Sequence, residues 1–369
     1  MPRPKLAILV SFSGQGGVER MIANLSQALV REPIDLDILL IKAQGPYVAQ
    51  LPDEARCITL RSRHSATSVI EVARYLRRER PDALLAIKHR AIIAALRAKR
   101  LSGVDTPISG RLGTTVSAAM SGKSRWRRAQ WFRAMRRYYP QLRQLIAVSQ
   151  GVADDVLAIT GMPKDQVCVI RNPTISEAML VAAESAPEHP WLAPGQPPVV
   201  LGVGRLTEQK DFPTLLRAFA LLLSEQDARL VILGEGGDRE KLEELAKALG
   251  IVDKMALPGF QTNPWSWMRR AAVFVLSSRW EGSPNGLTEA LALGTPVVST
   301  DCPSGPRELL QAGDIAPLVP MGDAPAMAQA MTRMLRQPPD PASLIASVSD
   351  YHQDVSARSY LKALNVPTP

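Results

Sequence analysis

The sequence predicts an α/β protein made of two doubly wound domains with parallel sheets. Short runs rich in Val, Ile and Leu alternate with longer amphipathic segments almost throughout, which is typical of βα units around a parallel sheet. The alternation stops once, in a proline-rich stretch, and then restarts. A chain of 369 residues is also longer than one hydrophobic core usually accommodates. Two domains in tandem are the expected consequence.

The strands can be placed from the apolar runs. In the first domain, residues 1–173, we expect strands at Leu6–Phe12, Asp35–Ile41, Arg56–Leu60, Ala83–Ile87, Pro107–Arg111, Leu145–Ser149 and Val167–Arg171. A linker is predicted at residues 174–198, where prolines are frequent and hydrophobic periodicity is weak. In the second domain, residues 199–349, we expect strands at Val199–Val203, Leu230–Leu233, Met255–Leu257, Val273–Ser277 and Pro296–Thr300. Residues 350–369 form a last segment with a helix expected at Asp354–Leu364.

The net charge of +9 comes from one part of the chain. No acidic residue lies between Asp105 and Asp154, whereas nine basic residues do: Arg111, Lys123, Arg125, Arg127, Arg128, Arg133, Arg136, Arg137 and Arg143. Subtracting these nine from the 44 Lys and Arg leaves 35, the number of Asp and Glu. A local excess predicts an anionic partner at one place, such as a membrane surface, a nucleic acid or a phosphorylated substrate.

Other bulk features narrow the class of protein. No apolar run approaches the roughly 18 residues of a membrane-spanning helix, and the first apolar run is expected to be a buried strand rather than a secretion signal. The cysteines Cys57, Cys168 and Cys302 match no metal-ligand spacing, and their odd number favours a reducing compartment.

A glycine-rich turn follows the first strand. Gly14-Gln15-Gly16-Gly17 leads into a helix predicted at Val18–Val30, and amides at a helix start favour an anion. The dinucleotide fingerprint is not matched, because a charged residue replaces its third glycine. A ligand-binding loop and a simple tight turn are both compatible with this pattern.

The second domain carries more specific motifs. Gly204, Arg205 and Lys210 follow a predicted buried strand, which places two cations at the carboxyl edge of a parallel sheet, where ligands of such sheets bind. Arg205 and Lys210 could neutralise a diphosphate.

A second motif, residues 281–289, follows the strand predicted at Val273–Ser277. A helix predicted at Gly286–Leu293 would offer the free amides of Gly286 and Leu287 to a phosphate. Glu281 and Glu289 flank those amides, and carboxylates accept hydrogen bonds from vicinal hydroxyls, as in a sugar and a ribose.

With these motifs, the chain resembles the retaining glycosyltransferases of family 4. The likeness rests on Gly204-Arg205-Leu206 with Lys210, on the glutamates Glu281 and Glu289, and on Gly294-Thr295-Pro296 after the second motif. It extends to residues 14–20, to Asn172-Pro173 and to residues 301–308, the last typical of bacterial surface-polysaccharide enzymes. The resemblance implies the GT-B fold: two facing Rossmann-like domains and a C-terminal helix that crosses back to the first domain.

The resemblance also implies roles for these residues. Arg205 and Lys210 would bind the donor diphosphate and stabilise the leaving group, and Glu281 would hold the transferred sugar. The remaining residues expected at the donor are Gly16, Gly17, Gly204, Phe260, Asn285, Gly286, Leu287 and Glu289. No cofactor and no metal are expected, because the nucleotide-sugar is a substrate and the diphosphate is served by cations and amides.

The first-domain part of the site departs from the family pattern. Many members have a histidine after the fifth strand, and Arg111 stands about at that position here. Arg111 either replaces that polar contact or has no role in catalysis. His89, between two basic residues at a strand end, is a further candidate on the acceptor side.

Asp35 and Asp37 have the spacing of a metal-binding carboxylate pair of another glycosyltransferase fold. Alternating Ile34, Leu36 and Ile38 favour an ordinary strand start instead.

The basic stretch predicts an amphipathic helix over residues 125–139. Trp131, Phe132, Met135, Tyr138 and Tyr139 share one face, with Arg133, Arg136 and Arg137 opposite. Such a helix suits an anionic bilayer, with aromatic side chains inserted. The alternative is a helix packed on its own domain with solvated arginines. Nucleic acid is not expected as a partner, since no binding module is present.

Taken together, the sequence predicts a metal-independent retaining glycosyltransferase of bacterial surface-glycan synthesis. The donor would be a nucleotide-sugar, UDP-linked rather than GDP-linked, and the acceptor a lipid-linked glycan or polysaccharide. The enzyme would be cytoplasmic, on the inner face of the membrane. A non-catalytic nucleotide-binding scaffold and a sugar-nucleotide epimerase are the alternatives.

Overall fold

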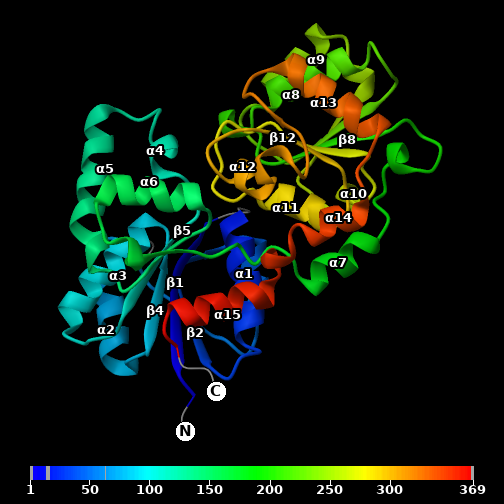
Figure 1. Ribbon diagram of the computed structural model, residues 1–369. Coiled ribbons are helices and arrows are strands. Elements are labelled where there is room, and N and C mark those ends of the chain that lie inside the picture. The colour runs from blue at the N-terminus through cyan, green and yellow to red at the C-terminus, as the bar shows by residue number, and fades with distance from the viewer. Residues whose placement is uncertain (1–2, 14–16, 63, 367–369) are drawn as a thin grey trace. The chain divides into compact units, whose positions relative to one another are not determined.

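The computed structural model describes residues 3–13, 17–62 and 64–366, and the chain divides into two compact units. Unit 1 comprises Met1–Thr174 and Asp350–Pro369, and unit 2 comprises Ile175–Ser349. Each unit holds one sheet with helices on both faces (Figure 1). The predicted pair of doubly wound domains is therefore confirmed.

The sheet of unit 1 is parallel throughout, in the order β3-β2-β1-β4-β5-β6-β7. Its strands are β1 (Lys5–Ser13), β2 (Asp35–Gln44), β3 (Arg56–Thr59), β4 (Ala83–Ile87), β5 (Ile108–Leu112), β6 (Leu145–Ala147) and β7 (Val167–Val169). The α-helices of this unit are α1 (Gly17–Leu29), α2 (Val69–Glu79), α3 (His89–Ser102), α4 (Val116–Ala119), α5 (Arg125–Tyr138), α6 (Gln150–Thr160) and α15 (Gln353–Ala363).

The two faces of this sheet carry separate cores because side chains alternate along each strand. Leu6 and Ile8 of β1 pack with α1 and α15, whereas Ala7 and Leu9 pack toward α2, α3, α5 and α6. Helix α15 lies beside α1, and its Tyr360 is fully buried (Figure 1). The predicted return of the C-terminal helix to the first domain is confirmed.

The sheet of unit 2 has the order β10-β9-β8-β11-β12-β13 and is also parallel. Its strands are β8 (Val199–Val203), β9 (Arg229–Leu233), β10 (Met255–Gly259), β11 (Val273–Leu276), β12 (Val297–Thr300) and β13 (Leu318–Val319). The α-helices are α7 (Glu177–Glu184), α8 (Phe212–Leu222), α9 (Arg239–Ala248), α10 (Trp265–Met268), α11 (Asn285–Ala292), α12 (Gly305–Leu309), α13 (Ala324–Arg336) and α14 (Pro341–Ala346).

The structure differs from the sequence prediction in two elements of unit 2. Strand β13 was not expected, because it is two residues long and lies between Pro317 and Pro320. Helix α7 occupies part of the segment that was expected to be an irregular linker. The Ser176 hydroxyl accepts a hydrogen bond from the Met179 amide and so begins this helix. Because the helix packs on α10, its start and packing outweigh the surrounding prolines.

In the described part of the chain, no helix is both long enough and apolar enough to span a membrane.

Candidate donor site and the family of the chain

The candidate site of unit 2 lies at the carboxyl edge of its sheet. Strands β8 and β11 are neighbours, with Val200 paired to Val273 and Leu201 to Phe274. Because parallel strands end at the same edge, the segment after β8 and the segment after β11 meet there. These segments carry the two motifs of the sequence analysis.

Lys210 and Glu281 form an ion pair at this edge. The Lys210 Nζ lies 2.7 Å from the Glu281 Oε1, and the side chains are 20% and 9% exposed. The Ser278 hydroxyl donates to the same carboxylate oxygen at 2.7 Å. The structure thus brings together two of the three predicted catalytic residues, which are 71 positions apart in the sequence.

Gly204 permits this arrangement by having no side chain. A Cβ at Gly204 would lie 2.9 Å from the Lys210 Cε and 3.1 Å from its Cδ. The lysine stem therefore runs flat against the end of β8. With any larger residue at this position, the lysine stem would have to shift.

Gln209 connects the two motifs and was missed by the sequence analysis. The Gln209 Nε2 donates to the main-chain carbonyl of Trp280 at 3.0 Å. The main-chain carbonyl of Gln209 accepts a hydrogen bond from the Arg279 amide at 2.8 Å. The exposed Arg205 reaches the Gln209 Oε1 at 3.5 Å. No residue pattern marks Gln209, because its contacts depend on the adjacency of β8 and β11.

A second loop braces the segment after β11. The Glu281 amide donates to the Pro303 carbonyl at 2.7 Å, and the Ser304 amide donates back to the Glu281 carbonyl at 3.2 Å. A Cβ at Gly305 would lie 2.6 Å from the Gly282 carbonyl oxygen and 2.7 Å from the Pro284 Cδ. The two loops are thus in direct backbone contact.

Helix α11 begins at Asn285, one residue before the predicted start. From the sequence, the amides of Gly286 and Leu287 were expected to be free, and for Leu287 this expectation was wrong. Its amide donates to the Pro284 carbonyl at 3.0 Å, because the first turn closes tightly on itself. Glu289, one turn further on, is 1% exposed.

Two more residues lie near this edge. Phe260 follows β10, two strands away from β8, and is half-buried. Burial and the nearby Glu281 raise the pKa of the Cys302 thiol to about 12. Cys302 is therefore a protonated thiol at neutral pH and not a nucleophile.

In unit 1, one predicted site residue, Gly16, lies outside the described residues. Gly17 is the first residue of α1, and Glu19 in the same turn is 4% exposed. The Lys88 Nζ lies 3.3 Å from the Glu19 carboxylate. This ion pair is at the carboxyl edge of β4 and was not predicted from the sequence.

Arg111 lies in the interior of unit 1. It is 1% exposed, and its Nη2 donates to the Asn172 Oδ1 at 2.6 Å. A Cβ at Gly113 would lie 2.7 Å from its Nη1, so the guanidinium packs on that glycine. In this arrangement the side chain joins β5 to the segment that leaves unit 1.

His89 is also buried, at 8% exposure. Its ring stacks on Trp131 of α5 with centroids 4.2 Å apart, and its Nδ1 lies 2.9 Å from the Tyr139 hydroxyl. Burial and the neighbouring Arg90 lower the pKa of His89 to about 4. The histidine is therefore neutral at physiological pH, and its Nδ1 is already engaged.

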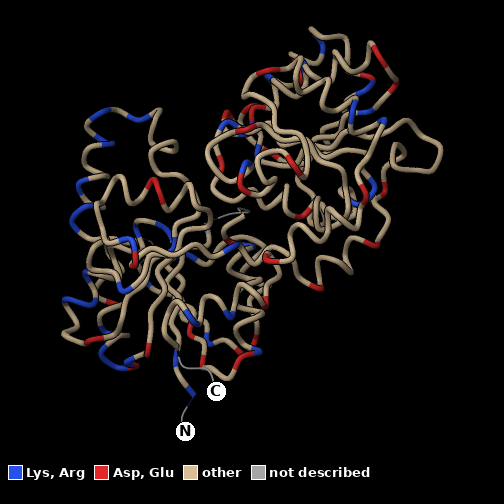
Figure 2. Tube along the Cα trace, viewed as in Figure 1, with Lys and Arg blue, Asp and Glu red and all other residues tan. Residues whose placement is uncertain are grey.

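The stacking of Trp131 on His89 shows that the aromatic face of α5 packs against unit 1. Met135 is fully buried, Trp131 and Phe132 pack against the core, and the Tyr138 hydroxyl lies 3.0 Å from the Arg97 Nε. The expectation that these aromatic side chains insert into a bilayer was wrong, because they contact their own domain. The arginines of α5 remain exposed, and Figure 2 shows basic residues but no acidic ones along this helix.

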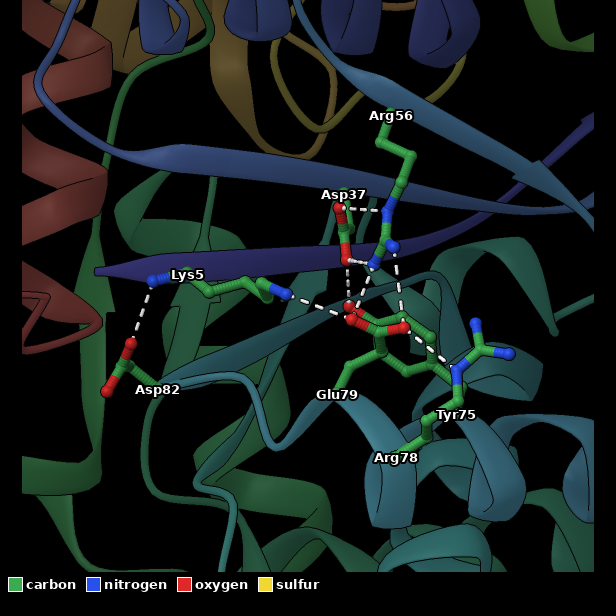
Figure 3. A network of polar contacts seen from close by, with 7 residues as sticks. All are labelled: Lys5, Asp37, Arg56, Tyr75, Arg78, Glu79 and Asp82. Carbon is green, nitrogen blue, oxygen red and sulfur yellow. Dashed lines mark hydrogen bonds and ion pairs between the residues drawn. The ribbon is translucent and has the colours of Figure 1, made fainter. Parts of the chain in front are cut away.

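Asp37, whose spacing from Asp35 is that of a metal-binding carboxylate pair, instead has a structural role. It is 3% exposed at the amino end of β2, where it accepts hydrogen bonds from Arg56 and from the Tyr75 hydroxyl. Glu79 binds Arg56, Lys5 and Arg78 in the same network (Figure 3). No cluster of three or more potential metal ligands is found among residues 3–13, 17–62 and 64–366.

Two family models match the chain. The model "Glycosyltransferase Family 4" matches residues 15–176, and the model "Glycosyl transferases group 1" matches residues 188–349. The matched ranges fall almost entirely within unit 1 and unit 2, respectively.

Individual proteins show the same likeness. The lipopolysaccharide core biosynthesis glycosyltransferase LpsE of Rhizobium meliloti is 27% identical over 88% of this chain and 87% of its own length. An N-acetylgalactosaminyltransferase of Campylobacter jejuni, which acts on a diphospho-undecaprenol-linked glycan by its name, is 40% identical over 37% of each chain. That second match therefore concerns only part of each protein.

A solved structure supports the fold. Anabaena HepE in complex with UDP superposes with a TM-score of 0.76 at 17% identity, covering 98% of this chain and 99% of that one. The superposition, together with the two Rossmann-like units, shows that the chain has the GT-B fold. The two family models together match residues 15–176 and 188–349, and the chain therefore belongs to the family 4 glycosyltransferases.

Proposed function

We propose that the protein is a retaining, metal-independent glycosyltransferase that uses a nucleotide-sugar donor in bacterial surface-glycan synthesis. The observation that carries this proposal is the Lys210–Glu281 ion pair at the carboxyl edge of β8 and β11. A cation there would offset charge on a departing nucleoside diphosphate, and the carboxylate would accept hydrogen bonds from sugar hydroxyls.

The other site residues have supporting roles. Arg205, exposed and contacting Gln209, would meet the second phosphate of the donor. Gly286 and Asn285, at the start of α11, would approach the phosphates with backbone groups, and Glu289 would bind the ribose. UDP is favoured over GDP as the carrier because the Anabaena relative of the same fold was solved with UDP.

The acceptor is proposed to be a lipid-linked glycan or a polysaccharide. The support comes from the names of the relatives, one in lipopolysaccharide core synthesis and one acting on a diphospho-undecaprenol-linked glycan. Such an acceptor would be met at the inner face of the cytoplasmic membrane. We therefore propose that the protein associates with that surface peripherally, through the exposed arginines of α5 and not through its buried aromatic face.

A panel of UDP- and GDP-sugars tests the activity. We expect slow hydrolysis of one donor, unchanged by EDTA, with retention of anomeric configuration seen by NMR. Binding without any turnover would support the scaffold alternative, and interconversion of the donor sugar would support an epimerase. Loss of activity in EDTA that Mg²⁺ restores would contradict metal independence.

Sedimentation with vesicles tests the surface contact. The protein should pellet with vesicles that contain phosphatidylglycerol, remain soluble with neutral vesicles, and be released by high salt. A variant with Arg133, Arg136 and Arg137 changed to Glu should remain soluble. Pelleting of this variant like the unchanged protein would place the contact elsewhere.

A further inference from the structure

Two side chains donate hydrogen bonds to the same oxygen of Glu281. The Lys210 Nζ and the Ser278 Oγ each lie 2.7 Å from the Glu281 Oε1. The two side chains differ in exposure, because that of Lys210 is 20% exposed whereas Ser278 is 0% exposed. Lys210 can therefore contact a ligand at the edge of the sheet, and Ser278 cannot.

The sheet of unit 2 fixes the position of Ser278. Strands β11 and β12 are paired, and Ser278 follows the end of β11. The Thr300 hydroxyl, at the end of β12, donates to the Ser278 main-chain carbonyl at 2.6 Å, and Thr300 is also 0% exposed. Buried hydrogen bonds of this kind restrict the groups that they join. The Ser278 hydroxyl is thus held in place beside the Glu281 carboxylate.

Lys210 interacts with two anions in the proposed function. It pairs with Glu281, and it offsets the negative charge of the diphosphate. A lysine ammonium is a point charge with three N–H groups on a flexible stem, so phosphate oxygens compete with Glu281 for it. No ligand competes for the buried Ser278 hydroxyl. Its hydrogen bond to Glu281 is therefore the one that persists when a nucleotide-sugar is bound.

We propose that Ser278 is a positioning residue for Glu281. Its hydroxyl holds the Oε1 atom and so sets the orientation of the carboxylate that accepts hydrogen bonds from the transferred sugar. Ser278 acts through Glu281 and does not touch the nucleotide-sugar itself. This inference rests on the proposed function, because it assigns Ser278 to the sugar-binding part of that site.

The first test compares Ser278→Ala with the unchanged protein. The kcat is measured for hydrolysis of the nucleotide-sugar that turns over in the donor panel, and the affinity for its nucleoside diphosphate, UDP or GDP, by isothermal titration calorimetry. Loss of a hydrogen bond to a charged group should lower kcat at least about tenfold. The affinity for the nucleoside diphosphate should stay the same, because this probe carries no transferred sugar.

The matched control is Ser266→Ala on α10. Ser266 is 2% exposed, and its hydroxyl donates to the Asn263 carbonyl at 3.1 Å. The control therefore removes an equally buried hydroxyl of the same unit that has no contact with Glu281. It should keep both the kcat and the affinity of the unchanged protein.

A second pair of variants isolates the hydroxyl from changes in packing. Ser278→Thr keeps a hydroxyl, and Ser278→Val has nearly the same shape without one. The kcat of the Val variant should be at least about tenfold below that of the Thr variant, with equal affinity for the nucleoside diphosphate. This pair decides the matter if the Ala variant does not fold.

Equal kcat within either pair would overturn the proposal. A loss of nucleoside diphosphate affinity that parallels the loss of kcat would also overturn it, because Ser278 would then support the whole site and not Glu281 alone. The same loss of kcat in Ser266→Ala would have that meaning too. If the unchanged protein hydrolyses no nucleotide-sugar, the proposed function is wrong and this inference falls with it, whereas active Ser278 variants of an active protein overturn this inference alone.

Discussion

Two clusters of charged side chains lie at the ends of strands, one at the amino edge of the unit 1 sheet and one at the carboxyl edge of the unit 2 sheet. In the first, the buried Asp37 and the half-buried Glu79 bind Arg56, Tyr75 and Lys5 (Figure 3). In the second, Lys210 binds Glu281 while Arg205 next to it stays exposed.

The difference lies in the elements that carry the charges. The first cluster sits on regular strands and on α2, so its partners are fixed by the fold, and its geometry suits stability. The second sits on loops and a 3-10 turn, Glu208–Lys210, which leave cations accessible at the edge where parallel sheets bind ligands. Substitutions should therefore affect stability in the first cluster and turnover in the second.

The largest effect is expected from Lys210→Ala. Loss of one preorganised cation should cost about 2 to 4 kcal/mol of transition-state stabilisation, measured as kcat/KM for donor hydrolysis or transfer. The control is Lys254→Ala, which removes a surface lysine paired with Asp227 in the same unit. Activity of Lys210→Ala within a few-fold of the control would mean that the ion pair is structural, like the first cluster.

Arg56→Met should lower the free energy of unfolding by disrupting the first cluster, and it should leave kcat unchanged. Among the described residues, Asp37 would keep only the Tyr75 hydroxyl as a side-chain partner for its buried charge, and removing one member of a buried pair destabilises strongly. Arg56 is 46% exposed, so water can partly replace it, and we expect a loss of about 2 kcal/mol in urea unfolding. Reduced kcat per folded molecule with unchanged stability would contradict this division of roles.

Much of the fold could be predicted from the sequence because each strand is a dense apolar run. Val199–Val203 and Ala83–Ile87 are found as predicted. The missed elements lacked that signal: β13 is too short to show a period, and α7 lies among prolines.

The residues of the candidate site that stand in local sequence motifs could be predicted from the sequence. Lys210 and Glu281 stand in such motifs, and the parallel sheet brings them together. Gln209, Ser278 and the Glu19–Lys88 pair depend on which strands are neighbours, which no local pattern gives. Periodicity likewise showed that α5 has an aromatic face, but the partner of that face, His89, is 42 residues away from Trp131 in the sequence.

Gly305→Ala should have a smaller effect that is confined to unit 2. The new Cβ would lie 2.6 Å from the Gly282 carbonyl oxygen, so one of the two loops has to move. Overpacking of this kind costs about 1 to 2 kcal/mol, and we expect it in kcat/KM because the moved loop carries Glu281. Gly122→Ala, where a Cβ meets open space, is the control. Equal kinetics of the two variants would show that the loop tolerates the shift.

The smallest effect is expected from Glu79→Gln, and it should depend on pH. Hydrogen bonds from Arg56 and Lys5 lower the pKa of Glu79 from 4.5 to about 2. A carboxyl group with a lowered pKa in the folded state stabilises it fully above its unfolded pKa and loses that contribution as the pH falls toward the folded value. The unchanged protein should therefore be more stable than Glu79→Gln at pH 7, and this difference should shrink between about pH 5 and pH 3 in urea unfolding. Glu54→Gln, at an exposed glutamate that forms no hydrogen bond or ion pair with any described residue, should show a difference that stays flat over the same range. A flat difference for Glu79→Gln as well would mean that the Arg56 and Lys5 contacts at the amino edge of the sheet add nothing to the stability of unit 1.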